Sequence, residues 1–494
     1  MYFTMSKVIK PVMFRSTRGG DAGTPFADVL FSAYASDGGL YVPEKIPMLK
    51  AKELREMADA TLAQITGMVL HLYTDISRQD CDMMASRAFA TFNGGEIPSV
   101  PLRRMREQTY FLETGSGPTL AFKDIGQQVV VQLMSYYLGK ERRTANILVE
   151  TTGDTGPAAV AAVKGLNNVN IFCLYPHQRV SDVQELQLTT VDEPNVFVFR
   201  TQVVDSDEQT FACKKLFQDA EFAKKYSVCS VNSINFGRVL AQCCYYIWAY
   251  LQVRPQVDGK VNFVVPSGAF GNACSGYLAK KMGIPIGRIV CATNANDFCH
   301  RTIATGDMRI ESSVATCSPA MDIQLAYNLE RMLYFMSSMN SDVVSEIMEQ
   351  VESPTRGVQL DDLLVMRIHE VFSSLRVSDA ETLAAIKTEY DASGYALCPH
   401  SAIGVHASKL RGLGLTDSDP VVCVLTAHHA KFEDTLRKAG IASPPHHAGV
   451  EKLKSMPSNH FEWLRSAPGQ TTQDKIDAWA ARIRERMIEV NARE

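Results

Sequence analysis

Residues 261–272 read VNFVVPSGAFGN, an apolar run closed by proline and followed by a turn with two glycines, and a helical stretch begins at Asn272. Such a run is typical of a strand covered on both faces in a parallel sheet. Glycine lets the backbone approach a ligand closely, and the free N–H groups at a helix start attract an anion. The stretch therefore predicts a strand, a phosphate-binding turn and a helix. The alternative is a turn that needs glycine only for its shape, since the spacing fits neither a dinucleotide fingerprint nor a P-loop.

The same order of strand, turn and helix recurs along the chain. Residues 147–150 read ILVE and are a strand candidate, Gly153-Asp154-Thr155-Gly156 follows, and residues 158–164 have helical periodicity. Further strands are expected at residues 169–175, 196–199, 289–293 and 421–426. This alternation predicts an α/β fold with parallel sheets, in which ligands bind beyond the carboxyl ends of the strands.

The length of 494 residues predicts several packed units rather than one core. The helical pattern of residues 48–95 suggests an N-terminal cap, and one amphipathic helix closes the chain. We expect four parts: an N-terminal cap region at 1–100, a domain with the candidate lysine and a carboxylate-binding turn at 101–255, a domain with the phosphate-binding turn at 256–440, and a C-terminal connection and helix at 441–494.

Composition narrows the class of protein. Hydrophobic residues make up 46% and charged residues 21%, and the net charge is −4 with mixed signs, so neither nucleic acid nor a membrane surface is an expected partner. The twelve cysteines lack the spacing of zinc or redox sites and suggest a reducing compartment. No apolar stretch is long enough to span a bilayer, and we expect a cytoplasmic enzyme, with a weak organelle signal left open.

Lys123 is the candidate for covalent chemistry. It lies in the segment GPTLAFKD of residues 117–124, among small and apolar neighbours and just before a long helical stretch. Burial favours the neutral amine that forms an imine with an aldehyde. From this segment alone, a solvated lysine at a helix start is the simpler interpretation.

Two further turns offer polar groups. Thr152, Gly153, Asp154 and Thr155 can present hydroxyl and N–H groups to a carboxylate, or else form an ordinary helix cap. Thr426 ends an apolar strand, and its hydroxyl can contact a ring nitrogen. The adjacent residues His428 and His429 lack a carboxylate or cysteine at ligand spacing, so no metal is expected.

Taken together and in this order, these segments resemble the threonine synthase family of fold type II pyridoxal-phosphate enzymes, which are similar to the tryptophan synthase β subunit. The resemblance runs from about residue 14 to residue 436. It is carried by residues 16–19, 37–43, 117–124, 153–156, 232–235, 267–272, 294–297, 321–323 and 430–432. It implies two open twisted sheets flanked by helices, with an N-terminal cap, and pyridoxal 5'-phosphate as the cofactor.

The resemblance also implies roles for individual residues. Lys123 would carry the cofactor as a Schiff base and act as the catalytic base, and Thr426 would meet the pyridine nitrogen. The cofactor phosphate would lie on the turn made of Ser267, Gly268, Ala269, Phe270, Gly271 and Asn272. The substrate carboxylate would meet Thr152, Gly153, Asp154 and Thr155.

Residues 320–324, 327–331 and 397–402 are similar to the second threonine-synthase-like branch of animals. That branch implies a phospholyase, which converts phosphothreonine or phosphohomoserine to 2-oxobutyrate, ammonia and phosphate. A threonine synthase is the alternative enzyme, and a protein that binds the cofactor without turnover is the alternative of another class. Lys431 and Arg18 are candidates for the substrate phosphate on charge alone. The oligomeric state cannot be predicted from these residues.

Overall fold

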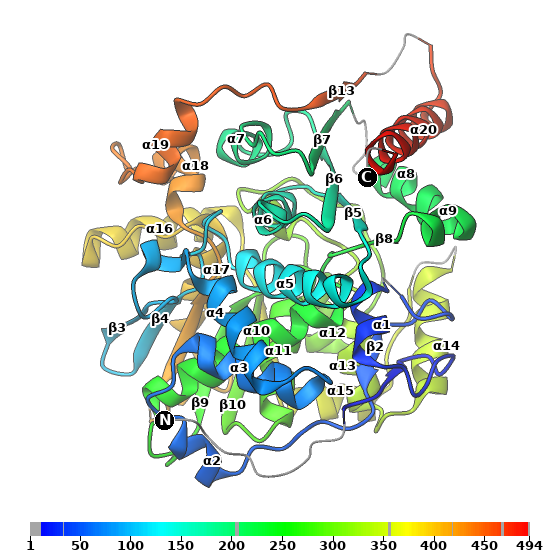
Figure 1. Cartoon of the computed structure of the whole chain (residues 1–494). Coiled ribbons are helices and arrows are strands. Elements are labelled where there is room, and N and C mark those ends of the chain that lie inside the picture. Colours follow the sequence, from blue (N-terminus) through cyan, green and yellow to red (C-terminus); the bar gives the residue numbers. More distant parts are fainter. Residues whose placement is uncertain are drawn as a thin grey trace.

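The computed structural model describes residues 11–32, 34–202, 207–353, 357–416, 418–465 and 469–492. These residues form two large open sheets and one small sheet (Figure 1). The six-stranded sheet has the order β11-β10-β9-β12-β4-β3 and is parallel except for β3, and the five-stranded sheet β13-β7-β6-β5-β8 is entirely parallel. The small sheet pairs β1 with β2 antiparallel.

The strands are short, as in most globular proteins. Their bounds are β1 Phe14–Ser16, β2 Tyr41–Pro43, β3 Leu102–Arg106, β4 Thr109–Glu113, β5 Ala145–Glu150, β6 Val169–Pro176, β7 Val196–Thr201, β8 Val228–Cys229, β9 Val261–Pro266, β10 Ile286–Thr293, β11 Phe372–Arg376, β12 Val421–Leu425 and β13 Glu462–Leu464.

Helices surround both large sheets (Figure 1). Their bounds are α1 Phe26–Phe31, α2 Ala51–Glu56, α3 Leu62–Tyr73, α4 Arg78–Phe89, α5 Lys123–Glu141, α6 Thr155–Val163, α7 Asp182–Thr189, α8 Asp207–Gln218, α9 Ala220–Lys225, α10 Phe236–Val253, α11 Gly271–Lys281, α12 Phe298–Thr305, α13 Leu329–Met336, α14 Ser341–Glu352, α15 Asp362–His369, α16 Asp379–Ser393, α17 Pro399–Ser408, α18 Glu433–Lys438, α19 Ala448–Lys454 and α20 Thr472–Asn491. Within the described ranges, no helix combines the length and apolarity that crossing a bilayer requires.

Alternating side chains of the central strands pack into different cores, because successive residues of a strand point to opposite faces. In β9, Phe263 and Val265 join one large buried cluster with residues of α3, α5 and α10, whereas Val264 packs with α16 and α17. In β5, Ile147 joins the large cluster and Leu148 packs with α8 and α20. Both sheets are therefore covered on both faces, and only their edges and strand ends remain for a binding site.

The predicted α/β fold with two open sheets flanked by helices is confirmed. The expected central strands are present as β5, β6, β7, β9, β10 and β12. The two sheets draw on distant parts of the chain: β4 pairs with β12 over residues 109–113 and 421–425, so the sheet that contains the glycine turn also includes strands from the predicted 101–255 domain. The four-part division of the chain stays a prediction.

Candidate active site

The end of β12 and the segment before α5 lie side by side. Ala121 and Ala427 form an antiparallel bridge, and the N–H of Phe122 donates to the carbonyl of Thr426 at 2.8 Å. Lys123, the first residue of α5, is therefore held directly beside the carboxyl end of a central strand. This is the edge at which the sequence predicted chemistry.

Asp124 fixes the shape of the loop that carries Lys123. Its carboxylate accepts hydrogen bonds from the hydroxyl of Thr119 at 2.5 Å and from the N–H of Thr119 at 2.9 Å. Burial raises the pKa of Asp124 to about 6, although the bonds from Thr119 favour the carboxylate. A Cβ at Gly117 would lie 2.5 Å from that carboxylate, so only glycine fits there. Leu120 has φ +61°, a left-handed conformation that costs a non-glycine residue free energy and often marks a functional loop.

Lys123 is half-buried as a residue, and its amine lies among charges. Burial is the main cause that lowers the pKa of this amine to about 8; Asp154 opposes the shift, and the cations Arg238 and Lys431 contribute to it. At neutral pH the neutral amine is therefore more populated than in an ordinary lysine, as imine formation requires.

Asp154 and Lys431 form a buried ion pair at 2.7 Å, with almost no exposed side-chain surface on either residue. Gln184 donates to the same carboxylate oxygen at 2.8 Å, and the ammonium also donates to the carbonyl of Thr119 at 2.8 Å. Burial opposes ionisation of Asp154, but the charges of Lys431 and then Lys123 outweigh it and hold the carboxyl pKa well below its usual range. Asp154 therefore remains a carboxylate beside Lys123.

The two cations proposed on charge alone have different surroundings. Lys431 lies within this cluster, whereas Arg18 contacts Glu330 at 3.0 Å and Glu352 at 2.9 Å. The guanidinium of Arg18 is thus already paired with two carboxylates. Of the two candidates, Lys431 is the one that the fold brings to Lys123.

The turn after β9 keeps its backbone donors unpaired. The N–H groups of Gly268, Ala269 and Phe270 donate no backbone hydrogen bond within the described ranges. Phe270 has φ +62° and directly precedes α11, so the turn runs into a helix start. The side chain of Asn272 accepts hydrogen bonds from the hydroxyls of Tyr245 at 2.5 Å and Tyr246 at 2.6 Å, which hold that start in place.

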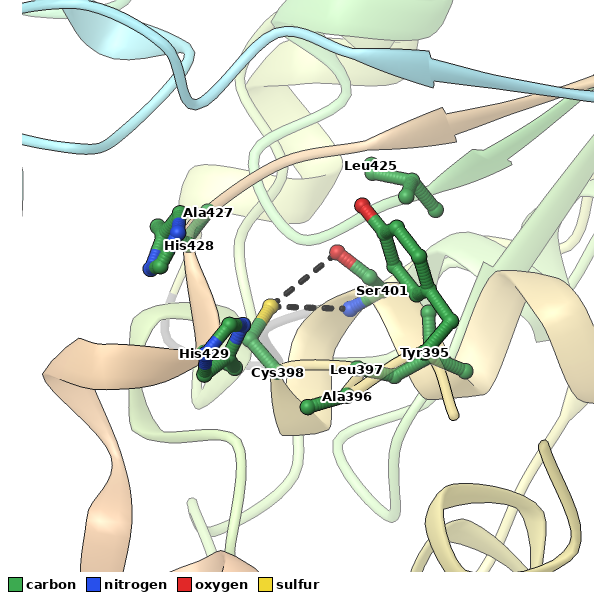
Figure 2. A pocket seen from close by; sticks show the side chains of 9 residues that line it. All are labelled: Tyr395, Ala396, Leu397, Cys398, Ser401, Leu425, Ala427, His428 and His429. Carbon is green, nitrogen blue, oxygen red and sulfur yellow. Dashed lines mark hydrogen bonds between the residues drawn. The ribbon is translucent and has the colours of Figure 1, made fainter. Parts of the chain in front are cut away.

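Thr426 contributes a buried hydroxyl whose oxygen has no hydrogen-bond partner among the described residues. Its N–H donates to the hydroxyl of Ser401 at 3.0 Å, and Ser401 in turn contacts the thiol of Cys398 at 3.0 Å. Figure 2 shows Ser401 and Cys398 facing each other in a small pocket that His428 and His429 also line. The network fixes the backbone of Thr426 and leaves its side-chain hydroxyl for another group.

The turn after β5 is held in shape by hydrogen bonds between its own residues. The hydroxyl of Thr151 accepts from the N–H of Gly153 at 3.1 Å and of Gly156 at 3.0 Å. Thr152 is exposed and Thr155 is half-buried. The four predicted carboxylate-binding residues thus lie on a fixed turn that joins β5 to α6, with the side chain of Asp154 directed to Lys431.

Within the described ranges, the only group of side chains spaced as metal ligands does not include His428 or His429. It comprises Glu433, His446 and Glu451. The ammonium of Lys454 lies 3.3 Å from Glu433 and 2.9 Å from Glu451, so a lysine already supplies the positive charge there. These three residues therefore give no reason to propose a metal site.

Comparison with known proteins identifies the group to which this site belongs. Residues 13–89 match the family Threonine synthase N terminus, residues 90–427 match Pyridoxal-phosphate dependent enzyme, and residues 401–467 match Threonine synthase, C-terminal. Threonine synthase-like 2 of Xenopus laevis is 35% identical over 476 residues, which cover 94% of this chain and 99% of that protein. The chain belongs to the threonine synthase family.

Other members of the threonine synthase family agree in sequence and structure. A threonine synthase of Pseudomonas aeruginosa is 35% identical and covers 87% of this chain and 91% of its own length. The pyridoxal-phosphate-bound threonine synthase from Brucella melitensis has a TM-score of 0.88 and 33% identity, over 96% of this chain and 99% of that one. The yeast enzyme has a TM-score of 0.87 and 30% identity, over 98% and 99%. The fold is therefore fold type II, and pyridoxal phosphate is the cofactor.

The residues of this site fit pyridoxal phosphate. The unpaired N–H groups of the turn after β9 suit its phosphate, and a Cβ at Gly268 would approach the backbone of Met321 to 3.1 Å, so glycine keeps this cradle open. The unpartnered hydroxyl of Thr426 suits a ring nitrogen. The bridge between Ala121 and Ala427 brings Lys123 close to Thr426, so both residues can contact the same ligand.

Sequence reasoning missed three residues of this cluster. Arg238 on α10 is buried and acts on the charge of Lys123, and Gln184 on α7 bonds Asp154. His400 on α17 is buried near the same charges. Arg238 and Gln184 belong to helical segments with no local motif for a site. His400 lies in residues 397–402, which carry a family resemblance but gave this histidine no role. Only packing against distant residues brings the three together.

Proposed function

We propose that this enzyme is a phospholyase, which eliminates phosphate from phosphothreonine, phosphohomoserine or both and yields 2-oxobutyrate, ammonia and phosphate. One observation carries the proposal: two cations, Lys431 and Arg238, act on the amine of Lys123, and Arg238 has no carboxylate partner within the described ranges. Asp154 opposes them but is itself paired with Lys431. A phosphorylated amino acid, with its carboxylate and phosphate, complements the charge that remains on Arg238.

Arg238 strengthens this charge argument. Its side chain is buried, one nitrogen donates to the carbonyl of Val231 at 3.1 Å, and within the described ranges no carboxylate pairs with it. Burial lowers its pKa to about 10, so the guanidinium stays charged at neutral pH. A buried cation without a partner is costly, and an anionic ligand reduces that cost.

In this proposal Lys123 anchors the cofactor and, once the substrate amine has replaced it, takes the proton from the substrate Cα. The cofactor supplies the electron sink that makes this proton acidic. The turn of residues 267–272 holds the cofactor phosphate, and Thr426 orients its ring. The turn of residues 152–155 binds the substrate carboxylate. The ammonium of Lys431 attracts the negatively charged phosphate as it leaves.

Threonine synthase is the second candidate, favoured by the likeness to threonine synthases in sequence and structure. The two reactions share the loss of phosphate and differ afterwards. A synthase adds water at Cβ and releases threonine, whereas a lyase lets the product hydrolyse to 2-oxobutyrate. The proposal favours the lyase because residues 320–324, 327–331 and 397–402 resemble the second threonine-synthase-like branch, and threonine synthase-like 2 proteins are 35% and 37% identical to the chain.

Product analysis separates the candidates. Holoenzyme is given phosphothreonine and, separately, phosphohomoserine, and phosphate, 2-oxobutyrate and threonine are measured in the same sample. Equal amounts of phosphate and 2-oxobutyrate support the proposal. Threonine as the main product overturns it in favour of the synthase, and no phosphate from either substrate favours a protein that binds the cofactor without turnover.

A matched pair of variants on α5 tests the role of Lys123. Lys123→Ala is expected to lose about 10³-fold or more of the phosphate release, together with the cofactor's bound absorbance band. Lys140→Ala, at the exposed end of the same helix, is expected to retain both. Equal activity of the two variants would exclude Lys123 as the base.

We also propose a cytoplasmic location. All twelve cysteines are free thiols, and eleven of them are buried, which is typical of proteins from reducing compartments.

A further inference from the structure

His400 is a buried histidine that the proposed reaction does not yet use. It is the second residue of α17, and only 3% of its surface is exposed. Its Nε2 atom accepts a hydrogen bond from the N–H of Ala320 at 3.1 Å, and its ring packs edge-on against Phe432 with centroids 4.9 Å apart. The ring is therefore fixed in position from two sides.

These contacts also fix where the proton of the imidazole lies. Burial lowers the pKa of His400 to about 4, so the ring is neutral at neutral pH. Because Nε2 accepts a hydrogen bond, the single proton of the neutral ring must be on Nδ1. That Nδ1 atom is buried and has no hydrogen-bond partner among the described residues. A buried donor without a partner is rare in a native protein and points to a missing ligand.

The surroundings of His400 identify the site it faces. The charges that act on the imidazole are those of Asp154, Lys123 and Lys431, the three central groups of the candidate active site. Its neighbour in the chain, Ser401, accepts the N–H of Thr426.

On its other side, His400 is tied to the phosphate-binding turn. Its partner Ala320 has a carbonyl 3.5 Å from the position of a Cβ at Gly268. His400 is thus linked to the turn of residues 267–272 through Ala320, and it also interacts with the charges of Lys431 and Asp154.

We propose that the Nδ1–H group of His400 donates a hydrogen bond to a phosphate oxygen bound in this site. A fixed neutral donor stabilises an oxyanion without adding a charge that would retain the departing group. The substrate carboxylate already has a place on the turn of residues 152–155, so a phosphate oxygen remains as the acceptor. Two phosphates meet this description, that of the substrate and that of the cofactor, and assignment to the substrate rests on the proposed function.

Two conservative substitutions separate the two nitrogens of this ring. His400→Asn places an amide N–H near the position of Nδ1 and loses the acceptor for Ala320, whereas His400→Gln places a carbonyl near Nε2 and loses the donor. We expect His400→Gln to weaken phosphate binding about tenfold and His400→Asn to retain most of it. His406→Gln, on the last turn of the same helix, is the control and should bind as the wild type does.

Binding is measured without turnover, so the test does not depend on which product the enzyme makes. Inorganic phosphate is titrated into each holoenzyme by calorimetry, and pyridoxal phosphate into each apoenzyme by fluorescence. A loss in His400→Gln for inorganic phosphate assigns the acceptor to the substrate phosphate, and a loss for pyridoxal phosphate alone assigns it to the cofactor phosphate. Both results support the proposed donor.

Unchanged binding of both ligands in His400→Gln overturns the proposal. Equal losses in the Asn and Gln variants also overturn it, because they would mean that the ring has only a packing role. If neither variant folds, ¹⁵N-histidine-labelled wild-type protein decides. Slower exchange of the His400 Nδ1 proton, either on adding pyridoxal phosphate to the apoenzyme or on adding inorganic phosphate to the holoenzyme, supports the donor role. Unchanged exchange in both titrations contradicts it.

Discussion

Lys431 and Asp154 show how single residues set the electrostatics of this site. Both are removed from water, which is costly for two charges, and their 2.7 Å contact is supported by Gln184 and by the carbonyl of Thr119. Removing one partner of such a pair leaves an uncompensated buried charge, whereas removing both avoids this penalty. The stability of the apoenzyme should therefore depend on the two residues jointly.

Asp154→Asn is expected to destabilise the apoenzyme by about 3 kcal/mol or more, because it leaves the ammonium of Lys431 buried and unpaired. The double variant Asp154→Asn/Lys431→Met should be more stable than the single one. Urea unfolding of the wild type, of the single variants Asp154→Asn and Lys431→Met, and of the double variant measures this difference. A double variant that loses as much as the two single variants combined would mean that the pair is not coupled.

Lys123 makes the stability of the apoenzyme depend on pH in a defined direction. Its pKa is about 8 in the folded protein against 10.5 for an ordinary lysine, so the unfolded chain binds this proton more tightly. The contribution of Lys123 therefore becomes more favourable as pH rises from about 8 to 10.5, and it is least favourable below pH 8.

Lys123→Met should accordingly raise the Tm of the apoenzyme at pH 7 by about 1–3 °C. This advantage should shrink as pH rises through the window between the two pKa values. Thermal unfolding from pH 7 to pH 10.5 measures it, with the exposed Lys52→Met as the control. An advantage that grows with pH would show that the amine of Lys123 is not desolvated in the folded protein.

At the scale of the elements, sequence patterns predicted the strands that are buried on both faces. The central strands β5, β6, β9 and β12 are mostly apolar and almost entirely buried, so their position could be predicted from composition. The edge strand β3 reads LRRMR and carries three arginines, a pattern that no strand rule selects. Its place depends on pairing with β4, which is a property of the fold rather than of the segment.

The same distinction applies to the candidate site. The Lys123 segment and the turn of residues 267–272 are continuous in sequence, and both could be identified there. The pairing of Lys431 with Asp154 joins residues nearly 300 positions apart, and the free donor of His400 is defined by a contact with Ala320. Such features depend on tertiary packing, so a single sequence does not contain a local signal for them.

The turn after β9 leads to a prediction about glycine. A Cβ at Gly268 would lie 3.1 Å from the Cα of Met321 and 3.3 Å from a methyl of Ile323, so Gly268→Ala should displace the turn. We expect the Kd of the apoenzyme for pyridoxal phosphate to rise about tenfold. Fluorescence titration measures it. Gly139→Ala on exposed helix surface, where the new Cβ meets only Asn168 at 3.9 Å, is the control, and an equal effect of both would contradict a specific cradle.

At the scale of the whole molecule, the residues that stabilise the outer side of the five-stranded sheet are separate from those of the candidate active site. Helix α20 packs against α8 on the outer side of the five-stranded sheet (Figure 1), and Trp479, Ile483 and Met487 are buried there. Lys475 adds a buried ion pair with Glu208 at 3.0 Å. This outer layer supports the sheet that carries the turn of residues 152–155, and its described residues contribute no group to the cluster around Lys123.

Trp479→Ala should therefore lower the free energy of unfolding by about 3–5 kcal/mol. The folded fraction should keep its cofactor absorbance and its activity per folded molecule. Ile488→Ala, at an exposed position of the same helix, is expected to change neither quantity. A Trp479 variant that folds normally but loses cofactor would place this layer in contact with the site.

The bridge between Ala121 and Ala427 has a consequence for how the protein is made in the cell. Lys123 leaves the ribosome long before the strand end that positions it, since roughly 300 residues must still be added, which takes about 15–60 s at ordinary rates of synthesis. Throughout that interval the nascent chain carries the amine of Lys123, the proposed cofactor anchor, without Thr426 beside it. Capture of the cofactor is thus postponed until synthesis is nearly finished, and truncated chains that end before residue 427 should emerge without bound vitamin B6.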